Sequence, residues 1–528
     1  MNEFLKDAIL YEIYPTSFYD GNGDGVGDFK GMIEKVDYLK SLGINLLWIN
    51  PFYLSPFRDG GYDVQDFYKV DPRFGDLEDF KAFARKCKEN GIKVLIDLVV
   101  GHTSIDHEWF KKSASTERNE YSDWYVWTNS AFTSYRGKTL QGMYERDGGF
   151  LINFFASQPA LNYGFRSREI EEEKNRSPKD NSGSWMIHYK DDRLKPLREE
   201  VIKIMKFWLE AGVDGFRVDM AQDMIKWCKY DDKDNHENKW LWENIIGPVK
   251  KEYKDLIMLS EWINPPTAVE CGFDFDYTSH DTPEYNALFR NEPHTNLSSV
   301  HEEGYNYFSG EGKGSIQALI DLTDMYQRET EGKGTYSLPT GTHDEIRMIT
   351  GAKSIAQAKC VFAFLLTFRH LPMIYYGDEI GIAHNFEVRK DGGAIRTGTR
   401  TPMQWNDQKN RGFSTADTLY LPTNEDAGID VERQEKDPNS LLNTVKKLIE
   451  IRKTYSCFNL DGKTDYIEKG YPLIFKRKDD KNTATIMINP SNNPIKRAIT
   501  GKVLYSVNCD ITDSEVTLNA QSFVITIE

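Results

Sequence analysis

The sequence lacks the features that mark secreted and membrane-bound proteins. Residues 1–7 hold no basic segment followed by an apolar one, so no signal peptide is expected. No uncharged apolar run reaches the ~18 residues that a membrane helix requires. The 6 cysteines are scattered, without metal-ligand spacing and without the pattern of a disulfide framework. We therefore predict free thiols in a cytoplasmic protein that has no membrane partner.

Positive charge is also scarce. The chain of 528 residues has 66 Lys and Arg against 82 Asp and Glu, a formal net charge of −16. This balance argues against a nucleic-acid partner and against an anionic membrane surface. Hydrophobic residues make up 39% and aromatic residues 13% of the chain, which indicates a folded globular protein. A small neutral substrate fits these properties.

What the chain has in quantity is an alternation of strand-like and helix-like segments, which predicts βαβ units and a parallel sheet. We expect strands at 8–14, 45–50, 92–100, 215–219, 256–261, 273–277, 336–344 and 372–376. We expect helices at 32–42, 77–90, 196–211, 240–253, 315–327, 354–369 and 440–455. Eight such repeats that close on themselves form a (β/α)₈ TIM barrel, whose function lies at the carboxyl ends of its strands.

Two regions interrupt or follow this alternation. Residues 102–190 are aromatic and polar without a clean period, which predicts a subdomain inserted after the third strand. Residues 456–528 alternate short β-rich runs with polar turns, which predicts a C-terminal antiparallel β domain, a small sandwich. The barrel then comprises residues 1–101 and 191–455. Within it, residues 389–439 form a loop whose length is typical of functional loops.

Four carboxylates fall at or near the predicted strand ends: Asp97, Asp219, Glu261 and Asp344. Arg217 lies two residues before Asp219 and points the same way, because side chains alternate along a strand. A neighbouring guanidinium keeps a carboxylate ionised, as a nucleophile requires. Alone, this pair could be an ordinary buried ion pair, but the other acidic strand ends favour a catalytic site.

Carboxylates with Arg and His, and without phosphate-binding glycines, suit glycoside hydrolysis. That reaction needs a proton donor and a carboxylate that faces the anomeric carbon. Glu261 precedes Trp262, and an apolar neighbour raises the pKa of a carboxyl group, as a general acid requires. A barrel enzyme that gathers its carboxylates around Mg²⁺ is the alternative. His102, His343 and the many aromatic residues favour a sugar.

Four segments at these strand ends resemble, in order, the principal motifs of the α-amylase family of retaining glycosidases. They are Asp97-Leu98-Val99-Val100-Gly101-His102, Gly215-Phe216-Arg217-Val218-Asp219, Ser260-Glu261-Trp262 and Thr342-His343-Asp344. The resemblance covers nearly the whole chain. It implies Asp219 as the nucleophile, Glu261 as the general acid/base and Asp344 as the residue that grips and distorts the sugar. It also implies that Arg217, His102 and His343 line the same subsite.

Three further segments resemble the branch of that family that holds oligo-1,6-glucosidases, α-glucosidases and trehalose synthases. They are Tyr11-Glu12-Ile13-Tyr14-Pro15, Asp59-Gly60-Gly61-Tyr62-Asp63 and Arg400-Thr401-Pro402-Met403-Gln404-Trp405. The resemblance implies that Asp59 and Arg400 hydrogen-bond the terminal glucose and that Tyr62 stacks on its apolar face. Residues 419–422 and 434–442 resemble trehalose synthases in particular.

The chain departs from the family pattern in places. Gly101 and Thr342 stand where the family usually has Asn, and Ala160 stands where it usually has Asp. Gly101 argues against a calcium site between barrel and insertion, whereas Thr342 can still donate a hydrogen bond. The residue after the nucleophile tracks the linkage in this branch: Val with α-1,6, and Ala or Thr with α-1,4. Met220 stands there, so this position decides neither linkage.

Residues 20–28 form an oxygen-rich loop of the kind that Ca²⁺ prefers, with glycines that allow a sharp turn. Gly31 stands at the twelfth position, so a full EF-hand is not expected, and an acidic surface turn is the alternative. The loop resembles the calcium loop of the same branch. This resemblance implies a structural Ca²⁺ with the ligands Asp20, Asn22, Asp24, Asp28 and the Val26 carbonyl.

These features together predict a retaining α-glucosidase that takes terminal glucose from short α-glucosides such as maltose or isomaltose. The Asp219 and Glu261 carboxyl groups should then lie ~5–5.5 Å apart. A transglucosylase or isomerase like trehalose synthase is one alternative. A catalytically silent barrel that acts as a binding protein is another, and the presence of all three carboxylates argues against it.

Overall fold

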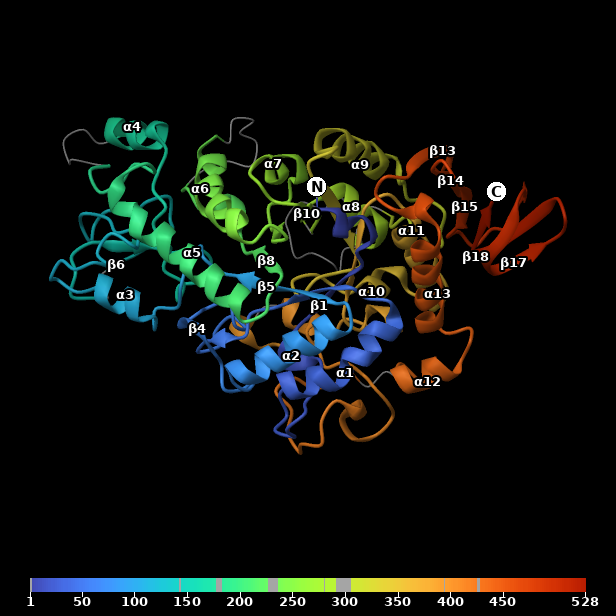
Figure 1. Ribbon diagram of the computed structural model, residues 1–528, viewed down its shortest axis with the longest axis horizontal. Coiled ribbons are helices and arrows are strands. Elements are labelled where there is room, and N and C mark those ends of the chain that lie inside the picture. The colour runs from blue at the N-terminus through green and yellow to red at the C-terminus, as the bar shows by residue number, and fades with distance from the viewer. Residues whose placement is uncertain are drawn as a thin grey trace. The chain divides into compact units, whose positions relative to one another are not determined.

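The structure is a computed structural model that describes residues 2–141, 144–176, 183–226, 236–279, 281–290, 305–393, 395–424 and 428–528. The chain forms two compact units. The first consists of Met1–Leu47, Lys86–Lys93 and Tyr277–Glu528, and the second of Trp48–Arg85 and Val94–Asp276. Figure 1 labels many of the elements of both units.

Eight strands form a closed parallel barrel in the order β1-β12-β11-β10-β9-β8-β5-β2. Each strand coincides with a segment for which the sequence predicts one, although β11 and β12 begin one residue earlier than predicted, so the predicted (β/α)₈ barrel is confirmed. Parallel strands are covered on both faces, and every residue of β1, β2, β8 and β9 is buried. The strands are β1 (Leu10–Ile13), β2 (Leu46–Ile49), β5 (Lys93–Leu98), β8 (Gly215–Val218), β9 (Ile257–Ser260), β10 (Phe275–Tyr277), β11 (Thr335–Pro339) and β12 (Leu371–Tyr375).

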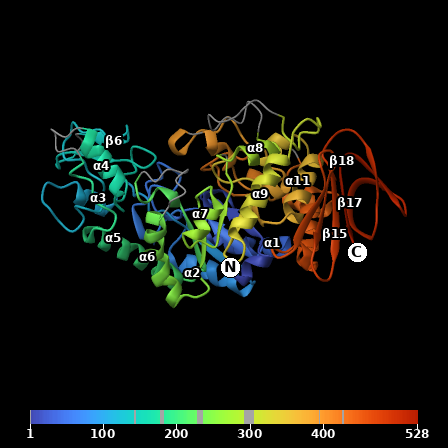
Figure 2. The same ribbon diagram turned by 90° about the horizontal axis from the view of Figure 1, so that it is seen from above.

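In the first unit, α11 (Ile355–Thr367) is mostly apolar, and most of its residues are buried. It packs between α13 (Leu441–Thr454) and the C-terminal strands β15 and β18 (Figure 2). The other helices of this unit are α1 (Phe29–Leu42), α8 (Pro283–Phe289), α9 (Gln317–Thr330), α10 (Met348–Ala352) and α12 (Val431–Lys436).

The C-terminal part of the first unit is an antiparallel sheet in the order β13-β14-β15-β18-β16, with β17 paired to β18. The predicted antiparallel β domain is thereby confirmed. Val516, Leu518 and Val524 of β18 belong to the apolar cluster on one side of the sheet. The strands are β13 (Lys463–Lys469), β14 (Leu473–Lys478), β15 (Thr483–Asn489), β16 (Ile495–Ala498), β17 (Lys502–Ile511) and β18 (Glu515–Ile527).

The second unit holds the region after β5, for which the sequence predicts an insertion. Its short elements pack on aromatic rings: Phe110 contacts the rings of Tyr125 and Phe150, with centroids 5.1 and 5.0 Å apart. A segment without a clean hydrophobic period can form a core in this way, because each aromatic ring buries a large apolar area. The helices are α3 (Glu108–Ser113), α4 (Ser167–Arg176), α5 (Lys195–Glu210), α6 (His236–Glu252) and α7 (Pro265–Glu270), and α2 (Leu77–Glu89) precedes them. The short strands are β3 (Tyr53–Leu54), β4 (Asp66–Val70), β6 (Thr139–Gln141) and β7 (Gly149–Leu151).

Two of the differences between the structure and the sequence prediction concern segments with an expected function. Strand β11 ends at Pro339, so His343 and Asp344 lie in the following loop instead of ending the strand. The predicted loop 389–439 contains α12, where Asp430 caps the helix by accepting a hydrogen bond from Arg433 N–H at 2.8 Å. A helix of 6 residues is too short to show a helical period in the sequence.

Five of the cysteines are described, and all five have free thiols: Cys87, Cys271, Cys360, Cys457 and Cys509. Cys228 lies outside the described residues. None of the helices described is long and apolar enough to cross a bilayer. The domain boundaries given above and the cytoplasmic location stay predictions.

Candidate active site

Arg217 is the centre of one group of predicted site residues, in the second unit. It lies on β8 with 1% of its surface exposed. Its Nη1 donates to Asp97 Oδ1 at 2.5 Å and to Asp219 Oδ1 at 3.0 Å, and its Nη2 lies 2.8 Å from Glu261 Oε2. One buried guanidinium therefore joins carboxylates that come from three neighbouring strands.

The strand register explains why the two carboxylates meet. Val218 of β8 pairs with Ser260 of β9, so the residues that follow, Asp219 and Glu261, are also neighbours. The backbone continues the pairing, because Glu261 N–H donates to Val218 O at 3.0 Å. Adjacent strands lie ~4.8 Å apart, which brings the two side chains to one guanidinium.

Met220, the residue after Asp219, turns the chain sharply. It has φ 43° and ψ 46°, a left-handed conformation that costs about 1–2 kcal/mol for a residue with a side chain. In this conformation its N–H donates to Glu261 Oε2 at 2.8 Å, and Ala221 N–H donates to Glu261 O at 3.1 Å. The turn thus positions Glu261 through the backbone, whatever side chain stands at position 220.

Asp97 lies inside β5 and is fully buried. Its Oδ2 accepts hydrogen bonds from Trp48 Nε1 at 2.7 Å and from the Tyr62 hydroxyl at 3.1 Å. Burial raises the pKa of Asp97, and the charge of Arg217 opposes that shift. Because its oxygens bind the protein, Asp97 positions Arg217 and Tyr62.

His102 and Asp59 are each held by a side chain for which no motif predicts a role. Asn153 donates to His102 Nδ1 at 3.0 Å, which leaves the ring proton on Nε2, 2.9 Å from Tyr62 O. Burial lowers the pKa of His102 to about 4, so the ring is neutral at pH 7. Gln158 Nε2 donates to Asp59 Oδ2 at 2.7 Å.

The side chains around position 101 explain why a glycine stands there. A Cβ added there would lie 3.0 Å from Asn153 Nδ2 and 3.0 Å from Met224 Cε. A larger residue would displace Asn153, which holds the His102 ring. Gly101 therefore leaves room for Asn153, and Asn153 holds His102. The sequence does not show this relation, because 51 positions separate Asn153 from His102.

Asp344 is the centre of the other group of predicted site residues, in the first unit. Its Oδ1 accepts hydrogen bonds from Arg396 Nη1 and from Arg400 Nη2, each at 2.8 Å. Arg400 is fully buried, and its Nε donates to His343 O at 2.9 Å. The structure thus places Arg400 on Asp344 and adds Arg396, which no motif indicates.

His343 is anchored by the first strand and its end. Its Nδ1 lies 2.7 Å from Oε1 of Glu12, which is fully buried on β1. Its ring stacks on Tyr14, with centroids 6.5 Å apart, and its Nε2 lies 3.4 Å from Asp344 Oδ2. Thr342 Oγ1 accepts a hydrogen bond from Asp344 N–H at 3.3 Å, so Thr342 supports the loop as a hydrogen-bond acceptor.

The predicted calcium loop is also in the first unit. Asn22 N–H donates to both Asp20 Oδ1 at 3.2 Å and Asp28 Oδ2 at 3.1 Å, so two buried carboxylates converge. Burial raises the pKa of Asp28, and the charge of Asp20 adds to that shift. Asn22 and Asp24 accept hydrogen bonds from the N–H groups of Asp24 and Val26, each at 2.9 Å. Among the described residues, no Lys or Arg pairs with either of these two buried carboxylates. The described residues also contain no group of three or more Asp, Glu, His or Cys side chains that could hold a metal ion.

A closed barrel of this kind carries its chemistry at the carboxyl ends of its strands, and a pair of carboxyl groups there is what glycoside hydrolysis uses. A family model described as alpha amylase, catalytic domain, matches residues 12–186 and 187–461. An oligo-1,6-glucosidase of Parageobacillus thermoglucosidasius is 32% identical over 526 residues, which cover 89% of this chain and 87% of that relative. The trehalose synthase/amylase TreS of Mycolicibacterium smegmatis is 28% identical over 509 residues, which cover 86% of this chain and 77% of that protein. The chain belongs to the α-amylase family and is an enzyme of the glycosidase class.

Solved structures of other enzymes have the same fold. A trehalose-6-phosphate hydrolase of Bacillus licheniformis superposes with a TM-score of 0.79 at 23% identity and covers 99% of both chains. An isomaltulose synthase of Erwinia rhapontici superposes with a TM-score of 0.79 at 22% identity, again over 99% of both chains. At this level of identity the likeness concerns the fold alone, and the reactions of these proteins differ.

Proposed function

We propose that the protein is a retaining α-glucosidase that removes terminal α-linked glucose from short α-glucosides such as maltose or isomaltose. The observation that carries the proposal is the pair Asp219 and Glu261, which follow adjacent strands and contact one guanidinium. Retaining glycosidases need carboxyl groups ~5–5.5 Å apart, whereas inverting enzymes need ~6.5–9.5 Å to admit a water molecule. Neighbouring strands with a shared arginine favour the shorter separation.

In the proposed mechanism, Glu261 protonates the glycosidic oxygen while Asp219 attacks the anomeric carbon from the opposite face. The bond to the leaving sugar breaks, and a glucosyl ester of Asp219 forms. Glu261, now ionised, accepts a proton from the water that attacks the ester. Glucose leaves with its α configuration, and Asp219 is again a carboxylate. Arg217 contacts the carboxyl groups of both Asp219 and Glu261. It stabilises the negative charge on Asp219 before the attack and on Glu261 after it.

The remaining predicted site residues take two kinds of role in this proposal. Asp344 grips the sugar hydroxyls, held in place by Arg396 and Arg400. Asp59 and Tyr62 contact the terminal glucose. Arg400 hydrogen-bonds the same glucose, and His102 and His343 line its subsite.

A product analysis tests the proposal. The protein is incubated with maltose, isomaltose, sucrose, trehalose and maltoheptaose, and every product is identified by chromatography. Proton NMR of the first minutes of the reaction gives the anomer of the glucose released. We expect α-glucose from the short substrates and little product from maltoheptaose. β-Glucose as the first product contradicts a retaining mechanism.

A transglucosylase or isomerase like trehalose synthase is the second candidate. The relative from Mycolicibacterium smegmatis and the resemblance at residues 419–422 favour it. In such an enzyme the released glucose stays in the site and is joined to a new acceptor. Trehalose formed from maltose supports this candidate, and glucose alone supports the hydrolase.

We also propose that the loop of residues 20–28 binds a structural Ca²⁺ through Asp20, Asn22, Asp24, Asp28 and the Val26 carbonyl. Two buried carboxylates that converge without a basic partner among the described residues repel each other, and a cation relieves that repulsion. The ion would hold the loop and take no part in the reaction.

Metal removal tests the calcium proposal. Dialysis against a chelator should lower the melting temperature by several degrees, and Ca²⁺ but not Mg²⁺ should restore it. The variant Asp28→Asn should melt at the same temperature with and without Ca²⁺. Metal analysis of the purified protein should find about one Ca²⁺ per chain, and a Ca²⁺-free protein whose melting temperature Ca²⁺ leaves unchanged disproves the site.

A further inference from the structure

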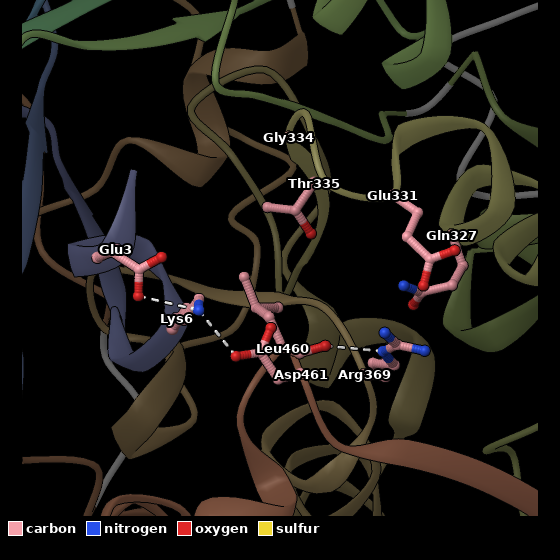
Figure 3. A pocket seen from close by; sticks show the side chains of 10 residues that line it. Glu3, Lys6, Gln327, Glu331, Gly334, Thr335, Arg369, Leu460 and Asp461 are labelled. Atoms are coloured by element: carbon pink, nitrogen blue, oxygen red, sulfur yellow. Dashed lines mark hydrogen bonds and ion pairs between the residues drawn. The ribbon is translucent and has the colours of Figure 1, made fainter. Parts of the chain in front are cut away.

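The first unit contains a cavity of about 270 Å³ at the amino ends of its barrel strands (Figure 3). It is bounded by the N-terminal turn η1 (Glu3–Asp7), the end of α9 and the start of β11. Arg369, two residues before β12, and the segment after η11 (Ser456–Phe458) complete its lining. No residue assigned to the active site lines it. Barrel enzymes carry their chemistry at the carboxyl ends of the strands, so this cavity has no part in that chemistry.

One wall of the cavity is an ion-pair network in which one ammonium group pairs with two carboxylates. Lys6 Nζ lies 2.9 Å from Glu3 Oε2 and 2.9 Å from Asp461 Oδ2. Hydrogen bonds from Lys6 to Asp461 and Glu3 raise the pKa of Lys6 to about 12. Figure 3 shows this network on one side of the cavity and Arg369, Gln327 and Glu331 on the other.

The opposite wall offers hydrogen-bonding groups that the protein does not use. Arg369 Nε donates to Leu460 O at 2.8 Å, and burial lowers the pKa of Arg369. Among the described residues, its two η nitrogens have no hydrogen-bond partner. The same holds for the side chains of Gln327, Glu331 and Thr335, which line the cavity beside it. This wall therefore presents both donors and acceptors.

The charges of the lining favour a neutral ligand. Lys6 and Arg369 are cationic, while Glu3, Glu331 and Asp461 are anionic, so the lining carries one net negative charge. An anion would face three carboxylates, and a cation would face a guanidinium. A molecule with several hydroxyl groups can donate to Glu331 and accept from Arg369 at the same time.

We propose that this cavity is a second, non-catalytic binding site for a neutral monosaccharide. Its volume is near the lower end of the ~300–1,000 Å³ of small-molecule sites, which suits a single sugar ring better than an oligosaccharide. The choice of D-glucose as the probe rests on the proposed function, which makes glucose the product. The polar lining itself does not depend on that function.

Equilibrium binding of D-glucose to the full chain tests the proposal. We expect two glucose sites in the natural protein, one of which disappears in Asp344→Asn and the other in Arg369→Gln. Arg369→Gln should weaken the cavity site by about tenfold or more, because hydrogen bonds to charged groups are among the stronger ones. Its kcat/KM on maltose should stay within about twofold of the natural value. A crystal soaked in glucose should show the sugar between Arg369 and Glu331.

Two further variants make the outcome decisive. Arg328→Gln is the matched control, because Arg328 lies next to Gln327 on α9, is exposed and pairs with Glu329. It should leave both sites intact. Glu331→Gln changes an exposed residue, so folding is not at risk, and should weaken the cavity site alone.

Several results would overturn the assignment. They are unchanged glucose binding in both Arg369→Gln and Glu331→Gln, or displacement of the cavity sugar by inorganic phosphate at equal concentration. Failure of the proposed function looks different. In that case maltose is not cleaved and Asp344→Asn loses no glucose site, while Arg369→Gln still does.

Discussion

At the scale of single residues, Arg217 joins the carboxylates of the proposed site. A guanidinium has five N–H donors in a fixed plane, and here that plane faces Asp97, Asp219 and Glu261. Removing one partner of a buried ion pair is costly because the other charge stays behind without water. The carboxylates and Arg217 therefore form one unit, and substitutions within it should not be additive.

The nucleophile gives the sharpest test at this scale. Asp219→Asn should lower kcat on maltose by about 10⁴-fold or more, because an amide cannot form the glucosyl ester. The fold should persist, since Asn can still accept a hydrogen bond from Arg217 Nη1. Steady-state kinetics and a thermal melt measure the two effects.

The matched control for that variant is Asp274→Asn. Asp274 is also buried, but its Oδ2 accepts a hydrogen bond from Met258 N–H at 2.8 Å and has no contact with Arg217 in the described structure. Asp274→Asn should lower the melting temperature and keep turnover. If Asp219→Asn keeps full turnover, the assignment of the nucleophile is wrong.

At the scale of elements, the close approach of β8 and β9 sets the site. Gly215 begins β8 opposite Ile257 of β9, and a Cβ there would come within 1.9 Å of Ile257 O. Backbone cannot move aside as a flexible side chain can. Glycine at this position is therefore required by packing, apart from any role in the motif that contains it.

Replacing Gly215 by Ala should destabilise the protein by about 3 kcal/mol or more, because the overpacked strand must shift. Gly247→Ala is the control: Gly247 lies inside α6 with nothing within 4 Å of an added Cβ. That variant should change the stability by less than about 1 kcal/mol, because the higher helix propensity of Ala is offset by the contact of its Cβ with the ring of Pro248, the next residue of α6. Urea unfolding gives both free energies, and equal effects in the two variants contradict the packing argument.

At the scale of the whole molecule, several histidines are buried in the neutral form. Burial lowers the pKa of His370 and His107 to about 3 and that of His102 and His384 to about 4. In the unfolded chain their pKa values return to ~6.5. Each of them therefore stabilises the fold fully above pH 6.5, and that contribution falls as the pH drops toward the folded pKa.

His370 isolates this effect. Its Nδ1 accepts a hydrogen bond from Leu338 N–H at 3.2 Å, and its Nε2 lies 2.8 Å from Leu365 O. Between pH 7 and pH 5 the natural protein should lose about 2 kcal/mol of unfolding free energy that His370→Gln does not lose. Urea unfolding at the two pH values measures the difference, and a difference that does not change with pH excludes the neutral buried state.

Much of the fold could be predicted because its signals are periodic or local. Alternating strand-like and helix-like segments predict the barrel, and short β-rich runs predict the C-terminal sheet. Carboxylates at strand ends predict the site, because parallel strands bring those ends together. The family motifs add the roles of Asp219, Glu261 and Asp344.

The contacts that hold these residues could not be predicted in the same way. Asn153 on His102, Gln158 on Asp59 and Arg396 on Asp344 join segments that are far apart in the chain. Such pairs have no period and no fixed spacing, so no pattern in a single sequence marks them.

The sequence by itself thus determined the architecture, since hydrophobic period and local spacing encode it, and its resemblance to the family motifs is the basis on which the reacting groups are proposed. Only the tertiary structure decided which side chain holds which, because that depends on register and on close approach in space. The buried guanidinium among three carboxylates and the glycine that makes room for Asn153 are both of this second kind.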